Sequence, residues 1–192
     1  MAPGVERVDL GESIDKHYKP LVLALQNLAM PVIAAVNGVA AGAGANIALA
    51  CDLVIAASSA SFVQAFCKLG LLPDSGGTWT LPRLVGNARA LGLTLLGNKL
   101  PAEQAAAWGM IWQCVPDAEF GAAVDALARA LAAAPTRGLA STKAAIRGCW
   151  QHSLAEQLDI ERDAQRELGQ SEDYAEGVAA FVAKRTPRFT GR

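Results

Sequence analysis

The sequence contains few of the residues that build metal centres and covalent cross-links. Its 192 residues include only two histidines and four cysteines, and no two cysteines form a CxxC pair. Because structural zinc sites need clustered Cys and His ligands, we expect no metal site. Thiols this far apart are typical of free cysteines in a reducing cytoplasm.

Excess charge of one sign and long apolar runs are also missing. The 17 Lys and Arg nearly balance the 18 Asp and Glu, for a net charge of −1. Without a basic stripe we expect no nucleic-acid partner, and without about 20 consecutive apolar residues we expect no membrane-spanning helix. The first seven residues lack the cationic start and apolar stretch of a secretory signal. These absences favour a cytoplasmic protein.

Apolar residues are plentiful but occur in short runs. They make up 52% of the sequence, and the mean hydropathy is +0.24. A chain of this length builds one compact core, with room for a helical appendage. Because this hydropathy is high for a small monomer, we expect a tightly packed oligomer.

The first half of the sequence alternates helical and strand patterns, which is typical of an α/β fold with a parallel sheet. Residues 1–12 read as loop. Apolar spacing predicts a helix over 13–30, kinked or delayed by Pro20. A βαβ unit follows: a buried strand at 32–36, a loop at 39–46 that opens into a buried helix, and a buried strand at 53–57. The later elements are a strand at 61–66, a loop at 69–78, helices at 79–85, 89–96 and 101–108, and a strand at 111–115.

After Pro116 the pattern becomes purely helical. Apolar residues recur at helical spacing over 119–134, 137–149, 153–168 and 172–184. Such a change marks a region with its own packing surface. We therefore predict an α/β core over 1–98 and a mostly helical region over 99–192, with a boundary that the sequence defines only loosely.

Two segments could carry chemistry, and the first is the run of small residues at 42–46. Backbone N–H groups at a helix start have no intrahelical partner, and small residues let a ligand oxygen approach them. Such donors suit the oxyanion that forms when a carbonyl becomes an enolate. Tight packing of a helix on a sheet also favours small residues, so this run alone leaves both interpretations open.

The second segment, residues 71–79, carries a single carboxylate, Asp74. It follows three apolar residues and precedes two glycines, Gly76 and Gly77, after one serine. Turned inward, Asp74 would be a competent base near neutral pH. The alternative is a turn or a helix N-cap, where aspartate is common. A hydrolase triad is not expected, because no serine lies in a nucleophile-elbow context.

Both segments belong to a pattern that resembles the crotonase (enoyl-CoA hydratase/isomerase) superfamily along essentially the whole chain. The matching motifs are PVIAAVNG (31–38), AGAGA (41–45), CDL (51–53), LGLLPDSGGT (69–78), LPR (81–83) with Gly86, LG (96–97), AEQA (102–105) and WGM (108–110). The resemblance implies the ClpP/crotonase-like spiral core, partly present in 1–98. It also implies that the helical region serves trimerisation and contact with coenzyme A.

The resemblance separates two reaction types within the superfamily. Hydratases use two glutamates, and the matching positions here are Asn46 and Phe66, which cannot exchange a proton as a carboxylate does. Family isomerases place one acidic base where this chain has Asp74. Other motifs resemble the isomerases that convert a ring epoxide of phenylacetyl-CoA to an oxepin-CoA in phenylacetate catabolism. These motifs are PDSGGTW (73–79), LLGN (95–98), AWGMIWQ (107–113) and AKR (183–185).

The implied chemistry is the enolate chemistry of an acyl-CoA isomerase. The N–H of Ala43 would bind the thioester oxygen, with Gly42 and Gly44 allowing the turn. Asp74 would take a proton from the substrate and return it at another carbon. The resemblance implies no cofactor, since the substrate itself carries coenzyme A.

The resemblance also implies binding residues and partners. Asn46 and Phe66 would line the acyl pocket, and Phe181, Lys184 and Arg185 would contact coenzyme A. The partners would be an acyl-CoA substrate and further copies of the chain, in a homotrimer or a dimer of trimers.

One departure from the superfamily keeps other functions open. Its members begin with several strands that precede the helix expected at 13–30 and supply the other oxyanion donor. We therefore expect a truncated chain or a misplaced start at Met1. The alternatives are an enoyl-CoA isomerase or hydratase of fatty-acid β-oxidation, and a non-catalytic fragment that only assembles with intact crotonase-fold subunits.

Overall fold

The structure is a computed structural model that describes residues 8–192. The expectations for residues 1–7, a loop without a secretory signal, lie outside the described residues. The chain divides into two compact units. One comprises the residues up to Gln26 together with Ala34–Asp117, and the other comprises Asn27–Ile33 and Ala118–Arg192.

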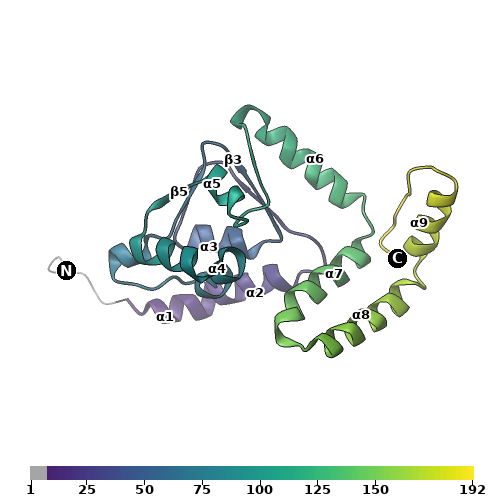
Figure 1. Cartoon of the computed structure of the whole chain (residues 1–192), viewed down its shortest axis with the longest axis horizontal. Coiled ribbons are helices and arrows are strands. Elements are labelled where there is room, and N and C mark those ends of the chain that lie inside the picture. Colours follow the sequence, from purple (N-terminus) through teal and green to yellow (C-terminus); the bar gives the residue numbers. More distant parts are fainter. Residues whose placement is uncertain (1–7) are drawn as a thin grey trace. The chain divides into compact units, whose positions relative to one another are not determined.

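The described chain opens with three consecutive helical segments: α1 (Leu10–Ser13), the π-helix η1 (Ile14–Tyr18) and α2 (Lys19–Asn27) (Figure 1). The Asp9 carboxylate caps the first turn by accepting two backbone N–H groups at 2.8 and 3.2 Å. The loop predicted up to residue 12 is therefore wrong from Leu10 onward. The Lys19 N–H donates to the Ile14 carbonyl, five residues back. This wide turn lies directly before Pro20, which has no N–H, so the helix continues past the proline.

The strands form two three-stranded sheets. The first has the order β1 (Ile33–Val36), β3 (Leu53–Ala57), β6 (Gln113–Val115), and the second has the order β2 (Val39–Ala41), β4 (Ser61–Val63), β5 (Lys99–Pro101). β3 pairs with β6 in parallel, and so does β2 with β4, whereas β4 and β5 are antiparallel. The predicted parallel pairing is confirmed. β2 is a correction, since its residues were expected in a loop, and β5 was not predicted.

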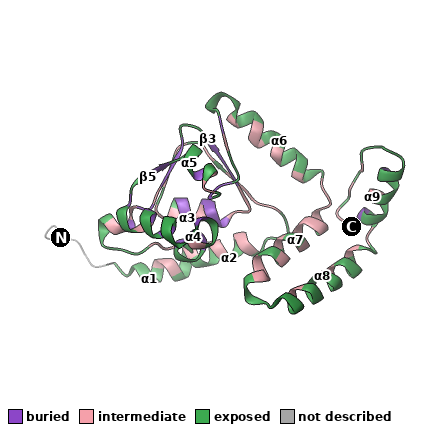
Figure 2. Cartoon of the chain, in the orientation of Figure 1, coloured by how far each residue is buried: buried purple, intermediate pink, exposed green. Residues whose placement is uncertain are grey.

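The predicted βαβ unit is present as β1, α3 (Ala43–Ala50) and β3, and α3 with β3 forms the centre of the core. Figure 2 shows buried residues concentrated in α3 and the strands. Ile55 of β3 and Ala45 of α3 are completely buried. β1 was expected to be buried, but its residues are intermediate or exposed. It lies at the edge of its sheet, where one side has no neighbouring strand.

Three helical segments complete the first unit: the 3₁₀-helix η2 (Ala65–Leu69), α4 (Gly77–Leu96) and α5 (Ala102–Ala107). α4 packs against α3 and η2 (Figure 1). Gly86 interrupts α4 with φ 74° and ψ 162°, so the two separate helices predicted for 79–85 and 89–96 are confirmed. Residues 99–117 carry β5 and β6, which pair with β4 and β3 of this unit rather than with the helical region.

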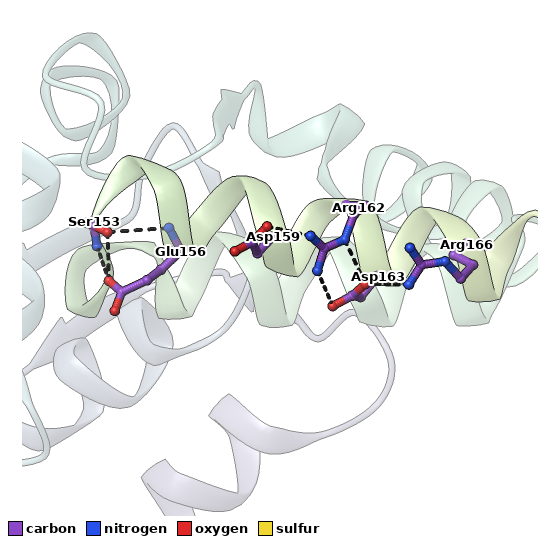
Figure 3. A network of polar contacts seen from close by, with 6 residues as sticks. All are labelled: Ser153, Glu156, Asp159, Arg162, Asp163 and Arg166. Atoms are coloured by element: carbon purple, nitrogen blue, oxygen red, sulfur yellow. Dashed lines mark hydrogen bonds and ion pairs between the residues drawn. The ribbon is translucent and has the colours of Figure 1, made fainter.

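The second unit is helical, as predicted. Its elements are η3 (Asp117–Glu119) at the border, α6 (Phe120–Ala132), α7 (Thr136–Gly148), η4 (Cys149–Gln151), α8 (Leu154–Leu168) and α9 (Glu172–Val182). Ser153 and Glu156 form a capping box at the start of α8, and an ion-pair network of Asp159, Arg162, Asp163 and Arg166 follows along that helix (Figure 3). α6, α7 and α8 contain no buried residue.

Among residues 8–192, no helix combines the length and apolarity needed to cross a bilayer.

Candidate active site

The site is built around the turn that leads into α3. Gly42 has φ 54° and ψ −125°, a backbone conformation that would be strained for any residue with a side chain. Its N–H donates to the Val63 carbonyl of β4 at 2.8 Å, which anchors the turn to the second sheet. Ala43 is the first residue of α3, so its N–H has no carbonyl partner within the helix. The geometry thus places the Ala43 N–H at a helix start, and its role as an oxyanion donor stays a prediction.

Gly44 does not contribute in the way expected. It lies inside α3 and is not among the glycines with a positive φ, so the turn does not require it. A Cβ at this position would meet no atom within 4 Å, so helix packing does not require a glycine either. Gly44 is exposed and leaves the outer side of the helix start uncovered.

Phe66 lies next to this turn. It is buried, in η2, and its ring atoms Cζ and Cε2 lie 3.5 and 3.6 Å from the position that a Cβ on Gly42 would take. The phenyl ring therefore forms an apolar wall beside the residue that precedes Ala43. Its predicted contact with an acyl group stays a prediction.

Asn46, in the first turns of α3, joins this turn to the Asp74 segment. Its side chain is 1% exposed, and its Nδ2 donates to the backbone carbonyl of Asp74 at 2.9 Å. Its Oδ1 accepts a bond of 2.8 Å from Nε2 of Gln64, which is 4% exposed. We expected Asn46 to line the acyl pocket, but here its amide is engaged by protein atoms on both sides.

Asp74 is half-buried and does not cap a helix. The N-cap of α4 is Gly76, and no side chain caps that helix, so the N-cap alternative is wrong. One carboxylate oxygen of Asp74, Oδ1, accepts the hydroxyl of Ser75 at 3.0 Å. Ser75 itself is 7% exposed and has φ 49°, a left-handed conformation unusual for a residue with a side chain. A strained serine thus holds one oxygen of the candidate base.

These contacts bring together most of the predicted catalytic positions. Asn46 links α3, which begins at Ala43, to Asp74, and Phe66 covers the turn between β2 and α3. In general, a helix-start N–H can stabilise an enolate while a carboxylate moves a proton, and these roles of Ala43 and Asp74 stay predictions. Within residues 8–192, no cluster of three His, Cys, Asp or Glu side chains could hold a metal ion.

The residues predicted to contact coenzyme A lie in the second unit. Phe181 is 86% exposed and lines a cavity of about 400 Å³ with Tyr174, Val178 and Phe189. Lys184 follows α9 with φ 52°. Their contact with coenzyme A stays a prediction.

Arg185 is already engaged within the second unit. Its guanidinium donates to both carboxylate oxygens of Glu176, at 2.6 and 2.8 Å. These bonds, followed by the Arg188 N–H at 2.7 Å, lower the pKa of Glu176 to about 2. We call these three residues the C-terminal clasp.

Sequence reasoning missed three residues of the site: Gln64, Ser75 and Gly77. Gly77 was recognised only as part of a motif, yet a Cβ there would lie 2.3 Å from Asn46 Nδ2. Gln64 bonds to Asn46, which lies 18 residues earlier in the sequence, and no local sequence pattern predicts such a bond. Ser75 could not have been found either, because serine is not among the residues that favour the left-handed conformation.

The comparisons with known proteins identify the family and the fold. The family model described as Enoyl-CoA hydratase/isomerase matches residues 6–192. The chain belongs to this family, within the crotonase superfamily. Its fold is the crotonase fold.

Individual relatives make the position within the family more specific. The chain is 60% identical to the 1,2-epoxyphenylacetyl-CoA isomerase of Escherichia coli K12, over 96% of this chain and 70% of that protein. A probable enoyl-CoA hydratase of Rhodobacter capsulatus is 51% identical, over 97% of this chain and 73% of its own length. The crystal structure of an enoyl-CoA hydratase from Polaromonas sp. JS666 superposes with a TM-score of 0.88 at 34% identity, covering 95% of this chain and 72% of that one.

Proposed function

We propose that the protein is an acyl-CoA isomerase that converts 2-(1,2-epoxy-1,2-dihydrophenyl)acetyl-CoA to an oxepin-CoA in phenylacetate catabolism. The 60% identity to the E. coli 1,2-epoxyphenylacetyl-CoA isomerase supports this assignment. The observation that carries it is the connection of Asp74 to the start of α3 through Asn46. This bond joins the backbone of Asp74 to the helix whose start is proposed to bind the oxyanion. An amide, Asn46, and a phenyl ring, Phe66, stand at the sequence positions that match the glutamates of hydratases.

The proposed reaction needs one carboxylate and no cofactor. The Asp74 carboxylate removes a proton from the carbon next to the thioester carbonyl, and the electron pair of that C–H bond forms the enolate. The N–H of Ala43 donates to the enolate oxygen, and the positive end of the α3 dipole stabilises its charge. The carbon–carbon bond shared by the epoxide and the six-membered ring breaks, and its electron pair joins the ring double bonds, which gives a seven-membered ring that contains the oxygen. Asp74 then returns the proton to a ring carbon, a double bond forms between the ring and the carbon that lost the proton, and the thioester carbonyl re-forms. No atom is gained or lost, which is what an isomerisation requires.

Replacement of Asp74 by asparagine tests this assignment, because it keeps the shape and removes the base. We expect the rate of oxepin-CoA formation from the ring epoxide, followed by mass spectrometry, to fall by roughly 10²–10⁴-fold. Asp125→Asn, an exposed carboxylate on α6, is the matched control and should retain the parent rate. An Asp74→Asn variant as fast as the parent would refute the assignment.

The same proton shuttle would move a double bond between the 3- and 2-positions of an enoyl-CoA. The 36% identity to a trans-2-decenoyl-[acyl-carrier-protein] isomerase of Streptococcus mutans favours this second activity. We expect the protein to convert a 3-enoyl-CoA to the 2-enoyl-CoA and to leave crotonyl-CoA unhydrated. Efficient hydration of crotonyl-CoA would instead support a hydratase of fatty-acid β-oxidation.

We further infer that the protein acts in the cytoplasm as a homotrimer or a dimer of trimers, with Phe181, Lys184 and Arg185 contacting coenzyme A. Helices α6–α8 have no buried residue, and their large apolar side chains Ile146, Leu154 and Leu158 are exposed. Helices that leave large apolar side chains exposed gain stability by packing against further copies. Light scattering that shows a well-folded monomer would contradict the oligomer.

A further inference from the structure

Two buried amide side chains hold the backbone of the candidate base. Gln64 Nε2 donates to Asn46 Oδ1 at 2.8 Å, and Asn46 Nδ2 donates to the Asp74 carbonyl at 2.9 Å. Gln64 and Asn46, here called the amide pair, are 4% and 1% exposed. The bonds connect the residue that follows β4, helix α3 and the loop before α4, three segments that lie far apart in the sequence.

The direction of this chain of bonds is fixed by the backbone carbonyl at its Asp74 end. A backbone carbonyl only accepts, so the Asn46 group that faces Asp74 must be the NH₂. Its Oδ1 then faces Gln64, which must offer its own NH₂ in return. Turning either amide would set oxygen against oxygen or NH₂ against NH₂. The Asp74 carbonyl thus requires the observed orientation of Asn46, and Gln64 supplies the donor that matches it.

The Asp74 carbonyl is held by a second donor as well. The backbone N–H of Gly77 reaches it at 2.8 Å, so both lone pairs of this oxygen are used. The Asn46 amide also fits closely against Gly77, where a Cβ would lie 2.3 Å from Nδ2. The peptide plane after Asp74 is thus fixed from two sides.

The amide pair leaves one buried acceptor unpaired. Among the described residues, Gln64 Oε1 has no hydrogen-bond partner. Buried polar atoms without a partner are rare because they cost free energy. Turning the amide to give this oxygen another environment would break the bond to Asn46, so the arrangement that holds Asp74 is kept in spite of the cost.

We propose that Asn46 and Gln64 are positioning residues that fix Asp74 for proton transfer, an inference that rests on the proposed isomerase function. Their side-chain amides bond to each other and to the Asp74 backbone. They set the orientation of the Asp74 peptide, and through it the carboxylate. A displacement of a catalytic group by about 1 Å can cost around 10²-fold in rate.

The test replaces the Gln64 donor by an acceptor of the same shape. Gln64→Glu places a carboxylate against Asn46 Oδ1, so the Asn46 amide turns and its oxygen faces the Asp74 carbonyl. We expect kcat to fall by at least about tenfold at pH 8, with KM changed by less than about threefold, because positioning acts on the chemical step. Relative to the parent at each pH, the loss should shrink as the pH falls, because the introduced carboxyl group regains a donor once it is protonated.

Two further variants separate positioning from a loss of folded protein. Gln64→Met keeps the length but removes the amide, so Asn46 stays free to donate to Asp74, and we expect a smaller loss of kcat than in Gln64→Glu. Gln104→Glu adds a carboxylate on the exposed side of α5 and should behave like the parent at every pH. Circular dichroism melts confirm that each assayed sample is folded.

Asp74→Asn is measured in the same assay so that the two proposals can fail separately. If Asp74→Asn is inactive while Gln64→Glu keeps the parent kcat and pH profile, the positioning inference is wrong and the proposed function stands. If Gln64→Glu loses kcat to the same extent at every pH and Gln64→Met loses as much, the amide orientation is irrelevant and the inference is wrong. If Asp74→Asn is fully active, the proposed function fails, and the inference fails with it.

Discussion

Replacing Gly77 by alanine should destabilise the protein, although glycine-to-alanine changes in helices normally do the opposite. Gly77 is the first residue of α4 and is not among the glycines with a positive φ, so the backbone itself accepts alanine. The added methyl group, however, would lie 2.3, 2.6 and 2.7 Å from Nδ2, Cγ and Oδ1 of Asn46. These atoms cannot move aside freely, because the Asn46 amide is bonded to Asp74 and Gln64.

The size of the effect follows from three contributions. Forcing one carbon into a filled site costs about 1–3 kcal/mol, and losing a buried hydrogen bond of Asn46 costs about 1–3 kcal/mol. The intrinsic preference of helices for alanine returns up to about 1 kcal/mol. We therefore expect the free energy of unfolding to fall by about 3 kcal/mol, which lowers the urea midpoint by roughly 1–2 M at an m value near 2 kcal/mol/M.

Gly92→Ala in the same helix is the matched control for this measurement. Gly92 is exposed, and a Cβ there would meet no atom within 4 Å. That variant should gain about 0.5–1 kcal/mol. Urea titration followed by circular dichroism measures both variants and the parent. A Gly77→Ala protein as stable as Gly92→Ala would refute the view that the Asn46 amide is held in place.

Two further predictions concern the helical unit. The pKa of Glu176, lowered from 4.5 to about 2 by the C-terminal clasp, means that the clasp stabilises the fold fully above about pH 4.5 and is lost as the pH falls toward 2. Hydrogen exchange at the Arg188 N–H should show protection that disappears as the pH falls through this range. Glu176→Gln should abolish this pH dependence. Unchanged protection of the Arg188 N–H at pH 2 would contradict the prediction. Ser153→Ala removes the capping box of α8 and should cost about 1 kcal/mol, read as a lower melting temperature, whereas Ser141→Ala inside α7 should change it little.

The helices of the second unit could be predicted from the sequence because their signals are local. Apolar residues repeat at helical spacing, and serine caps such as Ser153 and Ser171 mark where helices begin. The start of α1 had a similar signal in Asp9, with Glu12 three residues later, and could have been predicted from it.

The short strands could not be predicted in the same way. β2 and β5 have three residues each, and they exist because both pair with β4. Pairing between distant segments leaves little trace in three residues. The exposure of β1 was missed for a related reason: an apolar run predicts a strand but does not tell whether that strand is at the edge of its sheet.

Those parts of the candidate site that depend on local sequence features could be predicted. The Gly42 turn, the helix start at Ala43 and the carboxylate of Asp74 could be named from the sequence. The hydrogen bonds of Asn46 could not, because they join residues 18 and 28 positions apart. Sequence reasoning therefore assigned Asn46 to the substrate, whereas its observed partners are parts of the protein.

Gly86 divides α4 into two parts with different tasks. The part before Gly86 begins at Gly77, which lies against the Asn46 amide. The part after Gly86 carries the exposed leucines Leu91, Leu95 and Leu96. Because the helical conformation is interrupted there, the exposed leucines of the later part belong to a different helical turn system from the residues that contact Asn46. Evolution can therefore remodel an outer surface of this enzyme family member residue by residue while the geometry around the proton-transfer group is left undisturbed.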